Sequence, residues 1–108
     1  MGDGGVYASV RDLLSWEREW HRQWNAEASL LHAMLAPSPL KDGSIPAYRF
    51  GLEIAHHEGQ EVVFHGGGLW GFSTLILRLP QRGVSIVHLA NCAAAGPDME
   101  HILAAALA

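Results

Sequence analysis

Cysteine is nearly absent from this chain of 108 residues, in which Cys92 stands alone. A single cysteine excludes an internal disulfide, and it indicates nothing firm about the redox compartment. Charged residues are also scarce, at 17%, whereas an average soluble domain has roughly 25%. Hydrophobic residues make up 49% of the chain. Two interpretations stay open: ordinary variation between proteins, or a domain whose surface is covered by further protein.

Basic residues and long apolar runs are likewise scarce. The seven Lys and Arg side chains are scattered and the net charge is −4, which argues against a surface for nucleic acid. No apolar run reaches the roughly 18 residues of a membrane-spanning helix. Met1–Val6 has no basic region followed by an apolar stretch. No signal peptide is therefore predicted, and the chain as written would stay in the cytoplasm where it is made. The localisation itself stays open.

The seven histidines lack the spacing of a metal site. His56 and His57 are adjacent, so on a strand they would face opposite sides of the sheet. The sequence has no His-x-x-x-His pair and no pair of cysteines, and tetrahedral zinc sites depend on such spacings. We therefore expect no metal and no other cofactor.

Residues 1–36 carry helical signals. Ser9 followed by Asp12 is typical of a capped helix start. Asn25 is expected to cap a second helix, which Pro37 would end. A stripe at helical spacing within the first helix is expected to lie in the core: Leu13, Trp16, Trp20 and Trp24.

Residues 47–91 have the period of strands instead, and 96–108 return to helix. The predicted strands follow alternating or apolar runs: Tyr48 to Ile54, Glu61 to His65, Phe72 to Leu79 and Val84 to Ala90. Pro80–Gly83 is a hairpin turn, and Pro97 is expected at the first position of the last helix. The fold class is therefore α+β, with two N-terminal helices, an antiparallel meander of about four strands and a C-terminal helix. The helices are expected on one face of the sheet.

Three consecutive glycines, Gly66–Gly68, follow His65. Glycine weakens a strand, so the run indicates either a flexible loop or the close approach of a substrate or another backbone. His-Gly-Gly-Gly also occurs in lipases of the α/β-hydrolase class, which need a Gly-x-Ser-x-Gly turn downstream. Gly71–Leu75 lacks the second glycine, so that interpretation is rejected.

Five blocks in a fixed order resemble the serine β-lactamase family, which includes class C enzymes, penicillin-binding proteins, D-alanyl-D-alanine carboxypeptidases and esterases. They are similar to its GGLYST…DLARW, MLTP, YGLG, HGG…GF and P…G…VVLTN elements: Gly2–Ser9 with Asp12–Trp16, Met34–Pro37, Tyr48–Leu52, His65–Gly68 with Gly71–Phe72, and Pro80–Gly83 with Leu89–Asn91. The resemblance covers nearly the whole chain and implies the C-terminal portion of a β-lactamase-like domain, here a single partial domain over 1–108.

The resemblance also implies a site. Family members use Ser-x-x-Lys, Tyr-x-Asn, and a third motif of Lys-Thr-Gly or His-x-Gly on a strand. His65 would stand at the third-motif position and assist proton movement or polarity in the cleft. Gly66 and Gly67 would bind substrate along the strand edge. The Gly68 N–H, at the end of the strand and facing an open edge, would donate to the oxyanion.

The other two motifs are missing. Ser38–Lys41 matches Ser-x-x-Lys in letters only, because Pro37, Pro39 and Pro46 argue against the helix that the motif needs. We therefore identify no nucleophile in this chain and expect it to be inactive alone. The intact relative would acylate its serine with a small-molecule acyl substrate (a β-lactam, peptide or ester) and hydrolyse the product.

Two other functional classes stay open, a non-catalytic interaction module and a subunit completed in trans by an N-terminal chain. The expected partners are thus the missing N-terminal part of the fold or further copies of the chain. Self-association would use apolar surface left uncovered on the sheet: Leu75, Leu77, Val87 and Leu89, or the opposite face.

Overall fold

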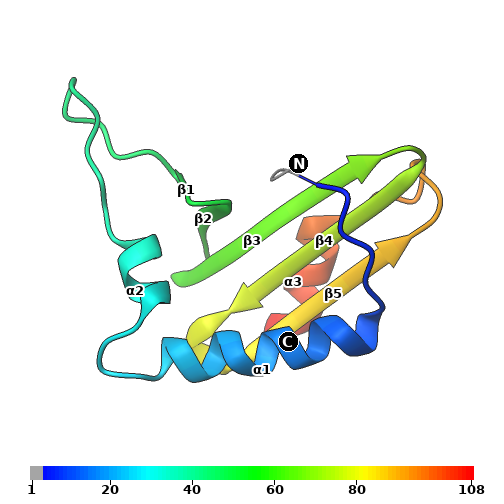
Figure 1. Cartoon of the computed structure of the whole chain (residues 1–108), viewed down its shortest axis with the longest axis horizontal. Coiled ribbons are helices and arrows are strands. Elements are labelled where there is room, and N and C mark those ends of the chain that lie inside the picture. The colour runs from blue at the N-terminus through cyan, green and yellow to red at the C-terminus, as the bar shows by residue number, and fades with distance from the viewer. Residues whose placement is uncertain (1–3) are drawn as a thin grey trace.

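The computed structural model describes residues 4–108, and these form three α-helices and a five-stranded antiparallel sheet of order β1-β2-β3-β4-β5 (Figure 1). Residues 1–3, which begin the segment where no signal peptide is expected, lie outside the description. The elements in chain order are α1 (Val10–Trp24), α2 (Leu30–Leu35), β1 (Tyr48–Arg49), β2 (Leu52–His57), β3 (Gln60–Leu69), β4 (Phe72–Leu79), a 3₁₀ turn (Pro80–Arg82), β5 (Val84–Ala90) and α3 (Met99–Leu107). The predicted α+β class is confirmed. None of the helices in residues 4–108 is long and apolar enough to cross a membrane.

The caps of the helices are partly those predicted. The Ser9 side chain accepts from the Asp12 N–H while the Asp12 carboxylate accepts from the Ser9 N–H, a reciprocal cap. The prediction that Asn25 begins α2 is wrong: Asn25 ends α1, and Ser29 caps α2 by accepting from the His32 N–H. The chain between Asn25 and Ser29 forms the connection between the two helices.

The last helix also begins later than predicted. The Asp98 carboxylate accepts from the His101 N–H and caps α3, so Pro97 precedes the cap instead of occupying the first helical position. Proline fits in either place because it has no N–H to satisfy.

The predicted strand from Tyr48 to Ile54 is two strands, β1 and β2, joined by a tight turn. Phe50 and Gly51 have φ values of 48° and 79°, which are the left-handed angles of a two-residue hairpin turn. Arg49 pairs with Leu52 across it. A turn of two residues does not interrupt the alternation of apolar and polar residues, so the alternation predicted one continuous strand. Only Gly51 indicated a turn at this position.

Helices cover both faces of the sheet, and the expectation of one covered face is wrong. Figure 1 shows α1 in front of the sheet and α3 behind it. One core joins α3 to the sheet through Val62, Leu75, Leu77, Leu79 and Leu103. The other joins α1 and α2 to the opposite face through Trp20, Leu31, Leu52 and Val63. The consecutive residues Val62 and Val63 therefore serve opposite cores, as alternation along a strand requires.

A buried polar network fastens α1 to the sheet. The Arg78 guanidinium on β4 donates two hydrogen bonds, of 2.6 and 2.7 Å, to the Glu17 carboxylate, and both side chains are almost wholly buried. Ser85 on β5 donates to the same carboxylate at 2.6 Å, and the His21 Nε2 lies 2.8 Å from the Ser85 hydroxyl. The Arg78 guanidinium also stacks 4.7 Å from the Trp20 ring centroid. These contacts hold α1 in one position on the sheet.

The prediction of exposed apolar surface on the sheet is wrong at two of its four positions. Leu75 and Leu77 are buried beneath α3, whereas Leu89 is 37% exposed and Val87 is half-buried. In the predicted tryptophan stripe, Trp20 is 6% exposed but Trp16 is 60% exposed. A spacing of four residues drifts around a helix, so one stripe cannot keep every member against the sheet.

Candidate functional site

The far half of β3 has a free edge. β2 pairs with β3 only as far as Phe64, because β2 begins at Leu52 directly after its turn from β1. From His65 to Leu69, β3 pairs with β4 alone among residues 4–108. In Figure 1 this part of β3 continues past the short β1–β2 hairpin toward the turn into β4. The free edge carries the whole His-Gly-Gly-Gly sequence.

The register decides which backbone groups face this edge. β3 and β4 are joined by Trp70 and Gly71, whose φ values of 50° and 86° define a two-residue turn. The flanking pair of such a turn, Leu69 and Phe72, exchanges hydrogen bonds, and the pairs then alternate along the ladder. By this alternation the N–H and C=O groups of Gly67 are directed at β4, and those of Gly66 and Gly68 are directed at the free edge.

The strand was expected to end at His65, but β3 extends to Leu69 and contains all three glycines. Only Gly67 is required by the fold itself. A Cβ at this position would lie 2.5 Å from the Thr74 Oγ1, which donates to the Gly67 carbonyl at 3.3 Å. A Cβ at Gly66 or Gly68 would meet its nearest atom at 3.7 or 3.8 Å, an ordinary contact. The described residues therefore give no steric reason for glycine at 66 and 68.

His65 has a partner that sequence reasoning missed. The Tyr48 hydroxyl lies 3.2 Å from His65 Nε2, and the two ring centroids are 5.7 Å apart. Both side chains are exposed. Tyr48 is the first residue of the predicted strand. Its contact with His65 depends on the turn between β1 and β2, which was not predicted from the sequence.

Ser38 lies in a loop, without the helix that a Ser-x-x-Lys nucleophile needs. It shares a hollow of about 210 Å³ with Tyr48 and Phe50. Within the described residues no hydrogen bond joins Ser38 to Lys41 or to His65. The arrangement gives the hydroxyl no base to activate it.

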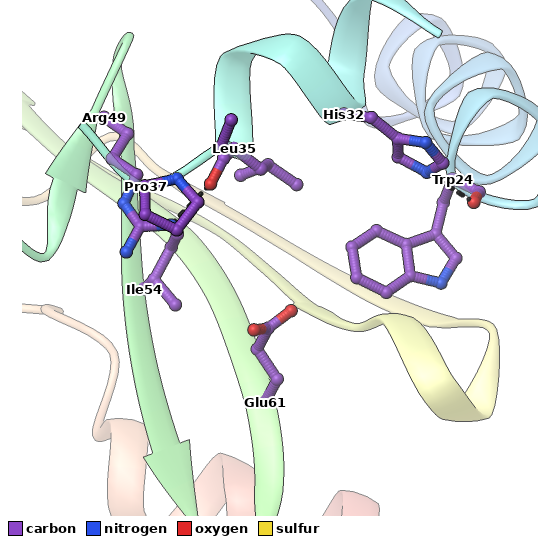
Figure 2. A pocket seen from close by; sticks show the side chains of 8 residues that line it. Trp24, His32, Leu35, Pro37, Arg49, Ile54 and Glu61 are labelled. Carbon is purple, nitrogen blue, oxygen red and sulfur yellow. Dashed lines mark hydrogen bonds between the residues drawn. The ribbon is translucent and has the colours of Figure 1, made fainter. Parts of the chain in front are cut away.

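A larger hollow of about 330 Å³ lies between the helices and β2–β3 (Figure 2). Its lining is Trp24, His32, Leu35, Ala36, Pro37, Arg49, Ile54 and Glu61. The Arg49 guanidinium donates to the carbonyls of Leu35 and Pro46, so it holds the loop in place. Figure 2 shows the Glu61 carboxylate directed toward the space between Ile54 and Trp24. None of the glycines on the free edge lines this hollow.

Comparison with known proteins extends over the whole chain. The protein-family model described as Beta-lactamase matches residues 1–108. A D-aminopeptidase of Gluconobacter oxydans (strain 621H) is 36% identical over 107 residues, which are 98% of this chain and 20% of the relative. A D-aminopeptidase of Brucella anthropi is 35% identical over 72 residues, which are 67% of this chain and 14% of the relative. The chain thus spans a fifth or less of the length of these relatives, and it belongs to the Beta-lactamase family.

Proposed function

We propose that the free edge of β3, from His65 to Gly68, is the third-motif strand of a serine hydrolase and binds the acyl substrate. The observation that carries the proposal is the edge itself. Among residues 4–108 it leaves the backbone groups of Gly66 and Gly68 without a strand partner, and it has glycine at two positions where the fold leaves room for a methyl group. A bare backbone at an open edge suits a ligand that adds to the sheet as a further strand.

The role of each residue follows from its direction. The Gly68 N–H faces the free edge, so it can donate to an oxygen that gains negative charge as the substrate carbonyl is attacked. The Gly66 N–H and C=O can pair with the substrate backbone and align it. His65, beside them, supplies a polar group for proton movement or polarity in the cleft. Gly67, which was also expected to bind substrate along the edge, pairs with Thr74 on β4 and leaves room for the Thr74 hydroxyl.

The nucleophile, its lysine and the tyrosine of Tyr-x-Asn come, in this proposal, from polypeptide other than these 108 residues. The serine oxygen attacks the substrate carbonyl, the amine or alcohol leaves with a proton, and water then hydrolyses the acyl-enzyme. Because the relatives are named D-aminopeptidases, we include D-aminopeptidase activity in the proposal for the assembled protein.

The experiment joins this chain to the preceding part of the Gluconobacter oxydans relative, chosen to include Ser-x-x-Lys and Tyr-x-Asn. D-Alanine p-nitroanilide and its L enantiomer are the substrates, and kcat/KM is measured. In this fusion Gly68→Pro removes the edge N–H and should lower kcat by about a hundredfold or more. Proline is tolerated where an edge N–H faces outward.

Gly68→Ala is the matched control, because it keeps the N–H and its methyl group has room. It should keep most of the activity. Equal kcat for Gly68→Pro and the unchanged fusion, with both folded, would show that the edge is not the oxyanion site.

The 108-residue chain alone should not hydrolyse either anilide or a chromogenic cephalosporin, because it lacks an activated nucleophile. Saturable turnover that Ser38→Ala abolishes would instead make Ser38 the nucleophile and overturn this part of the proposal.

A further inference from the structure

β1 is only two residues long, yet it carries the single aromatic contact to His65 found within residues 4–108. Tyr48 pairs with Glu53 on β2, and Glu53 pairs with Phe64 on β3. Tyr48 on β1 is therefore in line across the sheet with Phe64 on β3, the residue before His65. The Phe50–Gly51 turn makes β2 begin at Leu52, which leaves the β3 edge open beyond Phe64. The same turn brings β1 beside β2, so that the tyrosine hydroxyl lies 3.2 Å from Nε2.

The direction of this hydrogen bond follows from the two groups. A neutral imidazole has one N–H donor and one bare nitrogen that accepts, and a phenol both donates and accepts. The phenol O–H is the more acidic donor, and the imidazole nitrogen is the more basic acceptor. These two properties favour donation from Tyr48 to Nε2, which would place the ring proton on Nδ1, because the bond made at one ring nitrogen sets the state of the other.

We propose that Tyr48 is a positioning residue that holds His65 in the Nδ1–H tautomer. With Nε2 occupied by the tyrosine, the remaining ring nitrogen of His65 is then an N–H donor and not a proton acceptor. Such a donor can polarise a substrate oxygen without carrying a charge. This role rests on the proposed function of the edge, but the tautomer itself is a property of the chain without substrate.

Ring-nitrogen NMR of the ¹⁵N-histidine-labelled chain tests the tautomer directly, at a pH where the His65 ring is neutral. The unchanged chain should show the proton on Nδ1 of His65. Tyr48→Phe should shift the population toward the Nε2–H form that free imidazole side chains favour. Tyr7→Phe makes the same chemical change at an exposed tyrosine elsewhere and should leave the His65 signals unchanged.

An Nε2–H ring in the unchanged chain overturns the proposal, and so does a tautomer that Tyr48→Phe leaves unaltered. The first of these outcomes needs no variant, so it remains decisive even if Tyr48→Phe fails to fold.

Activity provides a second readout in the fusion described above. Asparagine places its amide nitrogen near the position of Nδ1, whereas glutamine places it near Nε2. His65→Asn should therefore retain about tenfold more kcat than His65→Gln, and the reverse order would contradict the donor role. Failure of the proposed function would appear instead in Gly68→Pro, which does not alter the Tyr48–His65 pair.

Discussion

Polar groups are paired within the protein where α1 contacts the sheet, whereas at the free end of the β3–β4 hairpin they face an open edge. At α1, the Glu17 carboxylate receives hydrogen bonds from Arg78 and Ser85 in a buried layer. At the hairpin, the backbones of Gly66 and Gly68 face an edge without a strand partner among the described residues. Buried polar groups must be paired inside the protein, whereas groups at an open edge remain available to a ligand. The first region therefore stabilises the fold, and the second is the surface that we propose for substrate binding.

Breaking the ion pair should have one of the two largest effects on stability. Glu17→Ala leaves the Arg78 guanidinium buried without its partner, which typically costs about 3–5 kcal/mol in the free energy of unfolding. Urea unfolding followed by circular dichroism measures it. Glu19→Ala removes the exposed pair with Arg22 and should leave the midpoint nearly unchanged. Equal effects of the two substitutions would contradict a structural role specific to the buried pair.

Trp16 and Trp20 belong to the same predicted stripe of α1 but differ in burial, so substituting each tests whether burial or the sequence pattern determines the loss of stability. Trp20→Ala should lower the free energy of unfolding by about 3–5 kcal/mol, since Trp20 packs in the core and beneath Arg78. Trp16→Ala, at a position 60% exposed, should change it by about 0.5 kcal/mol or less. A large loss for Trp16→Ala in the isolated chain would show that its side chain is buried in solution.

The glycines of the free edge should differ in stability as they differ in packing. Gly67→Ala overpacks Thr74 Oγ1 and should cost about 1–3 kcal/mol. Gly66→Ala has room and should be neutral or stabilising by up to about 1 kcal/mol. The double substitution Gly67→Ala/Thr74→Ala removes the clashing oxygen and should recover most of the loss. If the double substitution did not recover stability, the requirement for glycine at 67 would not come from its contact with Thr74.

His21 should make stability depend on pH. Burial lowers the pKa of His21 from its ordinary value of 6.5, the nearby Arg78 lowers it further and Glu17 opposes them. The Nδ1 of His21 is buried without a hydrogen-bond partner among the described residues, so a proton there would be poorly solvated. The folded state thus binds fewer protons than the unfolded state just below pH 6.5. Stability from this group is complete above that pH and falls as the pH drops toward the lowered pKa.

Urea unfolding between about pH 5 and pH 7, the range around the ordinary histidine pKa, checks this sign. His21→Gln keeps a donor for Ser85 but does not titrate, so its stability should fall less steeply with acid. If the two proteins keep a constant difference across this range, His21 is not the group responsible.

Local signals in the sequence predicted most elements because they depend on neighbouring residues. The Ser9–Asp12 cap, the strands β4 and β5 and the Pro80–Gly83 connection follow from side chains within a few positions. The errors arose where a pattern has two interpretations. A two-residue turn at Phe50–Gly51 preserves alternation, and the second helix had two residues able to cap it, Asn25 and Ser29.

The residues of the candidate site could be predicted from the sequence, but the contacts between them could not. The order of the five blocks indicated the family, which the match over residues 1–108 confirms. The roles assigned to His65 and Gly68 stay predictions. Tyr48 was missed because its contact with His65 spans 17 positions and depends on the pairing of three strands.

The sequence by itself determined the family, the α+β class and the His-Gly-Gly-Gly segment, since these reside in residue order and local propensity. Only the tertiary structure decided that helices cover both faces, that Glu17 meets Arg78, and that the pairing of β2 with β3 does not extend beyond Phe64 to the glycines. Each of these depends on contacts between residues far apart in the chain. The periodicity of a strand states that alternate residues face opposite sides, but it does not state what covers each side. That choice is made when the elements pack.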